Sequence, residues 1–119
     1  MKFSRLMRDG HTGLEQAFNG FFVFDTEGEI HCACAIGSAM IGAAGTTNLK
    51  DVLAYWKTRT SGNLTAGLVL NKLNIDRNMQ VTNPVTGKNG SLIRVIFDLN
   101  DMYRWEIIKI ADWLKGIGL

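Results

Sequence analysis

The stretch Cys32-Ala33-Cys34-Ala35-Ile36-Gly37-Ser38-Ala39-Met40-Ile41-Gly42-Ala43-Ala44-Gly45 carries no charged side chain, and most of its residues are small. If residues 34–44 are helical, the spacing i, i+3, i+4, i+7 and i+8 places on one face Ala35, Ser38, Ala39, Gly42 and Ala43. This face is nearly flat, so a neighbouring helix can approach it closely, and larger residues flank it. The pattern predicts a buried packing helix, which Gly45 is expected to end.

A β-hairpin is predicted immediately before this helix. Strand formers occupy 21–24, the turn sequence Asp25-Thr26-Glu27-Gly28 follows, and a second strand covers 29–32. Further upstream, residues 3–9 and 12–18 read as short helices separated by the turn dipeptide Asp9-Gly10.

Two helices are predicted in the middle of the chain. The first covers 49–57 with Asn48 as its N-cap, and the second covers about 64–73, where Gly67 weakens the pattern. Residues 74–89 are polar and rich in turn residues, so we expect a loop there, with a short strand around 79–82.

The C-terminal part contains one ambiguous segment and one clear helix. The β-branched residues of 91–99 suit a strand, but its apolar spacing fits a helix, which we choose, capped by Ser91 and ended by Asn100-Asp101. Residues 106–117 show the clearest amphipathic pattern of the chain. We expect the helices over 91–99 and 106–117 to pack against the small-residue helix.

The expected fold is therefore an α+β arrangement that is mostly α, a compact helical domain with one small β-hairpin near residues 21–32. A length of 119 residues, 46% of them hydrophobic and 20% charged, is typical of a single globular domain, here 1–119. No segment has the low-complexity composition of a linker.

Charge and hydropathy restrict the cell compartment and the classes of binding partner that we expect. A net charge of +2 is too small to indicate nucleic-acid or anionic-membrane binding by itself. The N-terminus has no apolar signal segment, and the uncharged run 32–45 is shorter than the ~20 residues that a bilayer requires. We expect a cytoplasmic protein without membrane contact, in which Cys32 and Cys34 are reduced because their spacing disfavours a disulfide.

Two blocks of the sequence carry a resemblance. The first runs from Gly28 to Ala39 and contains Cys34-Ala35-Ile36-Gly37-Ser38; the second is Leu99-Asn100-Asp101 followed by Trp105 and by Ile110-Ala111-Asp112-Trp113-Leu114. Both resemble a loosely defined group of small uncharacterised bacterial and phage proteins with a Cys-Ala-Leu-Gly-Ala helix and a later Leu-Asn-Asp, tryptophan, Ile-Ala-Asp-Trp-Leu pattern. Glu106 stands where that group usually places a helix-capping serine. The resemblance implies a source in a bacterium or phage, and it implies no activity.

Candidate chemistry centres on the cysteines and histidines. Cys34 at a helix start could act as a nucleophile with His31 or His11 as its base, although a cysteine among alanines more often behaves as a small apolar residue. His31-Cys32-Ala33-Cys34 has a shorter spacing than structural zinc sites, so we expect no metal and no cofactor. Gly37-Ser38 could cradle a phosphate, but the specific nucleotide-binding motifs are absent.

The remaining candidates are surface residues. Lys2, Arg5 and Arg8 could share one helix face and, with Lys88, contact nucleic acid, though a solvated face is the simpler reading. The large aromatic residues expected to lie partly at the surface and to anchor a protein interface are Trp56, Tyr103, Trp105 and Trp113.

These observations lead to one main hypothesis on function. The chain is expected to be a non-enzymatic accessory protein of a phage or mobile element that binds a host macromolecule, such as a component of a defence system, in the host cytoplasm. The alternatives are a small thiol-dependent enzyme using Cys34 and His31, and a nucleic-acid-binding regulator. The sequence does not indicate an oligomeric state.

Overall fold

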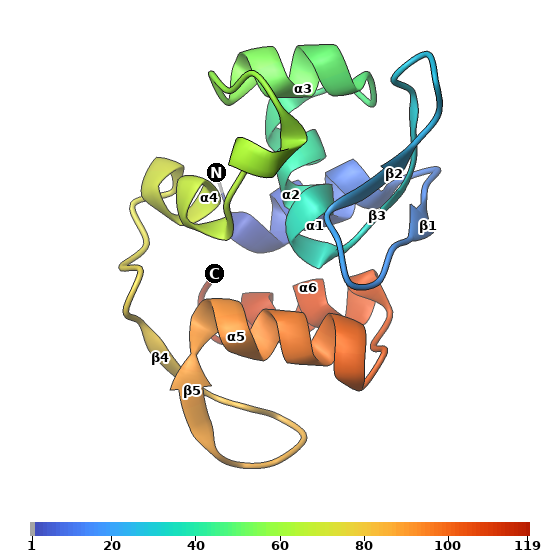
Figure 1. Ribbon diagram of the computed structural model, residues 1–119. Coiled ribbons are helices and arrows are strands. Elements are labelled where there is room, and N and C mark those ends of the chain that lie inside the picture. The colour runs from blue at the N-terminus through green and yellow to red at the C-terminus, as the bar shows by residue number, and fades with distance from the viewer. Residues whose placement is uncertain (1) are drawn as a thin grey trace.

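A computed structural model describes residues 2–119, apart from the side chain of Ser61 (Figure 1). Within these residues six α-helices account for 48% of the chain and two small sheets for 15%, so the fold is α+β and mostly helical, which confirms the predicted class. No helix in this range combines the length and the apolar character needed to cross a membrane.

Helix α2 (Ala35–Ala44) is the central element, and its position confirms the prediction made from the small-residue stretch. Its residues from Ala35 to Ile41 are all buried. The Sγ atom of Cys34 accepts a hydrogen bond from the amide of Gly37 at 3.3 Å at the start of the helix. Gly45 adopts a left-handed conformation with φ 72° and ends it, as expected.

The flat face of α2 packs on α1 (Phe3–His11), and the two backbones touch through glycines. A Cβ atom added to Gly42 would lie 2.0 Å from the carbonyl oxygen of Leu6, and one added to Gly10 would lie 1.6 Å from that of Ser38. The expectation that the helices over 91–99 and 106–117 both pack against the small-residue helix is confirmed only in part. α5 does contact α2, whereas α6 packs mainly on α1.

A three-stranded sheet lies beside the start of α2. β2 (Phe22–Phe24) and β3 (Ile30–Ala33) form the predicted antiparallel hairpin. β1 (Glu15–Gln16) adds a parallel strand on the other side of β3, so the order is β1-β3-β2. The predicted helix over 12–18 is wrong, because Gly13 turns the chain with φ +79° and the following residues pair with Cys32 and Ala33.

The middle of the chain follows the prediction closely. α3 (Leu49–Tyr55) begins at Asn48, whose side chain accepts a hydrogen bond from the amide of Asp51 at 3.2 Å. A short 3₁₀ turn (Ser61–Asn63) leads to α4 (Ala66–Lys72). These elements shorten the predicted helices by one or two residues at their ends, where helix boundaries are least determined by sequence.

A second hairpin precedes the C-terminal helices. β4 (Gln80–Thr82), which was predicted, pairs with β5 (Asn89–Ser91), which was not. α5 (Leu92–Phe97) follows with Ser91 as its N-cap, and this confirms the choice of a helix over a strand.

Asn100-Asp101 does not end the helix as predicted. The chain continues as a π-helical turn, η2 (Asp98–Met102), closed by a 2.9 Å hydrogen bond from the amide of Tyr103 to the carbonyl of Asp98. α6 (Ile107–Gly116) then begins after Glu106, which makes no side-chain cap.

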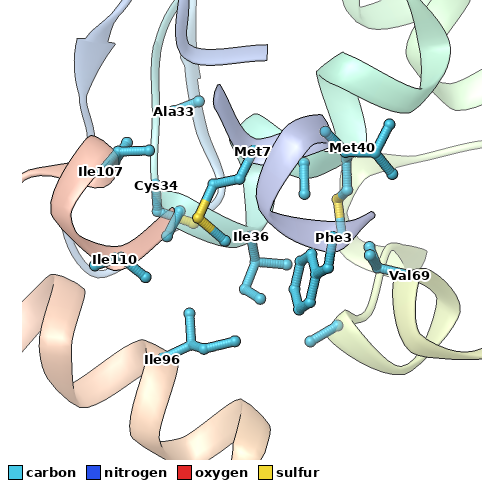
Figure 2. Packing of buried hydrophobic residues seen from close by; sticks show 14 of the residues in the cluster. Phe3, Met7, Ala33, Cys34, Ile36, Met40, Val69, Ile96, Ile107 and Ile110 are labelled. Carbon is cyan, nitrogen blue, oxygen red and sulfur yellow. The ribbon is translucent and has the colours of Figure 1, made fainter. Parts of the chain in front are cut away.

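The core is one continuous cluster to which all six helices, β3, β4 and the π-turn contribute (Figure 2). Figure 2 shows α1 and α2 contributing Phe3, Met7, Ile36 and Met40 from one side, while α5 and α6 contribute Ile96, Ile107 and Ile110 from the other. Cys34 lies within this cluster beside Met7, with 2% of its surface exposed.

Candidate functional site

The buried side chain of Asn100 joins three separate segments at the π-turn. Its Oδ1 accepts hydrogen bonds from the amide of Ala35 and from Nε2 of Gln16, each at 3.0 Å. Its Nδ2 donates to the carbonyl of Ala17 at 3.0 Å and to Asp101 Oδ1 at 2.7 Å. With 1% of its surface exposed, Asn100 satisfies its hydrogen-bonding groups within the protein. This network fixes the π-turn against α2 and β1.

The segment after the π-turn is held by the same network. Gln16 Nε2 also donates to the carbonyl of Trp105 at 2.8 Å, and the amide of Trp105 donates to the carbonyl of Leu99 at 2.8 Å. Arg104 has a left-handed φ of 52°, and its guanidinium group lies 4.3 Å from the ring centre of Phe18. The backbone of residues 103–106 is therefore tied to β1 and to the π-turn.

Two tryptophans and a lysine form what we call the tryptophan stripe, defined as Trp105, Lys109 and Trp113. They are spaced four residues apart in the sequence: Trp105 lies two residues before α6, and Lys109 and Trp113 lie one helical turn apart within it. Lys109 is exposed, and its Nζ lies 4.0 Å from the ring centre of Trp105. Both tryptophans pack partly on the core and keep part of their surface accessible. The stripe thus contains two half-buried tryptophans and one exposed cation, which contacts the ring of Trp105.

Other apolar residues of the C-terminal segment are also accessible. Tyr103 is half-buried, Met102 is 64% exposed and Ile117 is 39% exposed. Of the four aromatic residues predicted to lie partly at the surface, three are thus found on this C-terminal segment. Partly exposed aromatic residues together with methionine are the residue types enriched in protein interfaces.

Trp56 does not share this surface. Only 8% of it is exposed, and its Nε1 donates to the carbonyl of Met40 at 3.3 Å, which ties the end of α3 to α2. The Tyr55 ring packs edge-on against it at 5.2 Å, and Lys72 covers Tyr55 at 4.5 Å. Trp56 is a packing residue, contrary to the expectation that it lies partly at the surface.

The cysteine and histidine candidates lie in different surroundings, with Cys34 buried and His31 exposed. Burial raises the pKa of the Cys34 thiol to about 11, which is the opposite of the shift that activates a cysteine. His31 is exposed on β3, and its Nε2 lies 2.9 Å from Asp25 Oδ2. His11 lies in the last turn of α1, where burial lowers the pKa of its imidazole and Glu106 acts in the opposite direction.

The start of α2 is not a phosphate cradle, because its amides already have partners. Ala35 donates to Asn100, Gly37 donates to Cys34 Sγ, and Ser38 donates to the carbonyl of Cys34 at 2.7 Å. Across residues 2–119, no three histidine, cysteine or acidic side chains come together as ligands of one metal ion.

Three of the four predicted basic residues lie together on α1. Arg8 forms an ion pair with Asp112 of α6, Arg5 lies 3.8 Å from Asp9, and Lys2 Nζ donates to the carbonyl of Gly118 at 2.8 Å. Lys88 belongs instead to the loop between β4 and β5. The structure therefore brings Lys2, Arg5 and Arg8 against the end of α6.

Sequence reasoning missed two residues of this region. The sequence predicts Asn100 at a helix end, because nothing local distinguishes an exposed asparagine from a buried one. Lys109 is absent from the predicted site residues, although its spacing of four residues from Trp105 and Trp113 is visible in the sequence. No protein-family model, curated protein or solved structure matches the chain.

Proposed function

We propose that the protein is a non-enzymatic binding protein that docks a partner protein on the tryptophan stripe. The observation that carries this proposal is the contact of Lys109 with the partly accessible ring of Trp105, whose backbone is hydrogen-bonded to Gln16 and Leu99, together with the partly accessible Trp113 on the same helix as Lys109. Tryptophans in such positions supply a large share of the binding energy in protein interfaces. Because they are already ordered by packing on the core, binding costs little further conformational entropy.

The charge at the stripe indicates the chemistry of the partner. Lys109 is an exposed cation at the ring of Trp105, so a partner with an acidic side chain surrounded by apolar residues is complementary to it. An acidic protein surface fits this arrangement better than a nucleic-acid backbone, because the stripe offers one cation, whereas backbone recognition uses many.

The source and setting belong to the same proposal. Small size and the resemblance to small bacterial and phage proteins support an accessory protein of a phage or mobile element. Its partner would then be a host protein in the host cytoplasm, and a component of a defence system is the target that we propose. The test is phage plating on bacteria that carry such a system. Expression of the protein should raise plating efficiency, and expression of the Lys109→Glu variant should not.

Partner capture with matched charge variants tests the stripe itself. The bait is the full chain in a nuclease-treated host lysate, compared with Lys109→Glu and with Lys88→Glu, which changes the same charge on the distant β4–β5 loop. We expect one stoichiometric protein with the wild type and the Lys88 variant, and its loss with the Lys109 variant. Equal capture by all three baits, or loss of the partner on nuclease treatment alone, would contradict the proposal.

A further inference from the structure

Strand β2 forms one edge of the three-stranded sheet, because the strand order is β1-β3-β2. Figure 1 shows the hairpin of β2 and β3 at one side of the molecule. Within the residues that the structure describes, the backbone of residues 22–24 forms no hydrogen bond with any segment other than β3. The outer side of an edge strand presents N–H and C=O groups with which another extended chain can pair.

The register of the hairpin identifies the backbone groups that point outwards. The carbonyl of Phe21 accepts a hydrogen bond from the amide that follows β3, and the amide of Asp25 donates across the hairpin, each at 3.0 Å. The register shift places its extra residue, His31, in β3, so the alternation along β2 is unbroken. Residues that bond to the neighbouring strand alternate with residues that do not. Phe22 and Phe24 therefore direct their N–H and C=O groups to the free edge.

The side chains of β2 combine an anchor with an accessible apolar surface. The Phe22 ring lies against α2, since its Cε1 atom would be 3.1 Å from a Cβ atom added to Gly37. Val23 is 54% exposed and Phe24 is 45% exposed. The strand is thus fixed to the central helix, while its edge and two of its apolar side chains remain open to a partner.

The turn that follows β2 is negatively charged. Residues 9–49 contain no lysine or arginine, and five of them are acidic. Three of these acids lie in or beside the turn, at Asp25, Glu27 and Glu29. Among the described residues, their only ion-pair contact is with His31, whose Nε2 lies 2.9 Å from Asp25 Oδ2.

The surroundings of the hairpin do not cancel this charge. Lys50, the first lysine after the turn, is followed directly by Asp51, which carries the opposite charge. Near the start of β2 two cations are balanced by two carboxylates, and these four residues are Arg94, Asp98, Asp101 and Arg104. The excess of negative charge is therefore confined to the turn end of β2.

We propose that the edge of β2 binds an extended basic segment of another protein, which adds a strand to the sheet. The N–H and C=O groups of Phe22 and Phe24 pair with the backbone of this segment. An apolar side chain of the segment lies beside Val23, and a lysine or arginine two positions away lies at Asp25, because alternate side chains share one face of a strand. The opposite charges favour basic segments over acidic ones.

A second copy of β2 does not meet these requirements, because residues 19–24 carry no charged side chain to place at the turn. The edge shares no residue with the tryptophan stripe. It therefore goes beyond the proposed function, and either of the two sites can fail without the other.

A ¹H–¹⁵N NMR titration of the full chain tests the proposal. The probe is the capped heptapeptide Thr-Lys-Thr-Val-Thr-Lys-Thr, in which valine and both lysines share one face, so that a lysine reaches the turn in either strand direction. We expect saturable shifts at the amides of Phe22, Phe24 and Asp25. The same peptide with glutamate in place of lysine should bind about tenfold more weakly or less.

A backbone control distinguishes strand addition from simple attraction between charges. The probe with N-methyl groups on its three central residues keeps its charge but loses the N–H donors, so it should not bind. No saturable shift with the unmodified probe at millimolar concentration, or equal binding of the N-methylated peptide, would overturn the proposal. In that case the short strand and its acidic turn serve only to protect the edge.

Variants of the protein locate the binding site. Glu27→Gln should weaken binding of the probe by about threefold, whereas Glu15→Gln removes the same charge from the other edge strand and should leave the Kd unchanged. Val23→Thr retains a β-branched side chain and should also weaken binding. Equal effects of Glu27→Gln and Glu15→Gln would assign the attraction to net charge. Shifts at residues 22–24 on dilution of the free protein would assign the edge to a second copy, and either result would overturn the proposal.

Discussion

The amide of Ala35 donates a hydrogen bond to Asn100 Oδ1 at 3.0 Å, across 65 positions of the sequence. The first amide of a helix usually points to water or to a local cap. Here it joins the central helix to the π-turn, which is followed by the segment that carries Trp105, so the core and the start of the candidate site share one structural support.

Asn100→Ala should destabilise the protein more than an ordinary polar-to-alanine change. The variant leaves the buried amide of Ala35 and the carbonyl of Ala17 without their partner, and each such loss costs about 1–3 kcal/mol. We expect the free energy of unfolding in urea to fall by about 3 kcal/mol or more. Asn78→Ala, at an exposed position, is the control and should change it by less than about 0.5 kcal/mol. Equal effects of the two changes would refute the role assigned to Asn100.

Gly42→Ala should be strongly destabilising even though alanine favours helices. The new methyl group would meet the carbonyl oxygen of Leu6 at 2.0 Å, and backbone atoms cannot move aside as a flexible side chain can. A loss of about 2 kcal/mol or more is expected in thermal or urea unfolding.

Gly116→Ala is the matched control for this change. Gly116 is also helical, but a Cβ atom there would meet no heavy atom within 4 Å. This substitution should be neutral or stabilising by up to about 1 kcal/mol. A Gly42→Ala protein as stable as the Gly116→Ala protein would show that α1 and α2 can separate at no cost.

Cys34 should be unreactive in the native protein. Its raised pKa of about 11 and its burial keep the thiol protonated and inaccessible, whereas the half-buried Cys32 is partly accessible. With iodoacetamide at neutral pH, mass spectrometry should find label on Cys32 and none on Cys34 until the protein is unfolded. Rapid labelling of Cys34 in the folded state would restore the thiol-enzyme hypothesis.

The same pKa shift predicts a change of stability at high pH. The unfolded thiol loses its proton near pH 9 and the folded one near pH 11, so the contribution of Cys34 is complete below pH 9 and is lost as the pH rises to 11. The stability difference between wild type and Cys34→Ala should shrink over this interval by up to about 3 kcal/mol. A difference that stays constant between pH 9 and pH 11 would contradict the shift.

Asp25 should stabilise the hairpin turn in its charged form. Hydrogen bonds from His31 and from the amide of Glu29 lower the pKa of this carboxyl group below its ordinary value. The charged Asp25 therefore stabilises the folded protein at pH values above the pKa that Asp25 has in the unfolded chain. This stabilisation is lost as the pH falls through the lower pKa that Asp25 has in the folded protein. In NMR titrations the pKa of Asp25 should rise in His31→Gln, and an unchanged value would exclude His31 as the main cause.

Most helices could be predicted because their signals are local. Asn48 and Ser91 accept hydrogen bonds from amides three residues ahead, and Gly45 needs only its own left-handed conformation. These signals lie within one turn of the helix, so spacing and residue type are enough to find them.

The predictions are wrong where contacts between residues far apart in the sequence determine the local structure. Residues 15–16 form a strand because they pair with β3, and the helix of 92–97 continues as a π-turn that is closed against Gln16 and Ala35. The partner of α2 depends on Gly10, whose importance is visible only when both helices are in place. None of these contacts has a signature within one segment of the sequence.

The candidate site was predictable in part. The aromatic residues of the C-terminal segment were identified by type, and their accessibility at Trp105 and Trp113 agrees with that choice. Trp56 is the same residue type but is buried against the Met40 carbonyl, a contact set by the packing of α3 on α2. The last turn of α6 lies beside Lys2, Arg5 and Arg8. This position depends on the tertiary fold, so the sequence did not predict it.

The contact between Ala35 and Asn100 also has a consequence for hydrogen exchange. Because the acceptor belongs to the π-turn, the Ala35 amide exchanges with solvent when that turn opens, and its rate is not governed by fraying of α2. The exchange rate of one amide at the start of the central helix therefore reports on local opening of the π-turn that precedes Trp105. A partner that binds to this segment and suppresses its opening would slow deuterium uptake at Ala35, a residue that the partner does not contact.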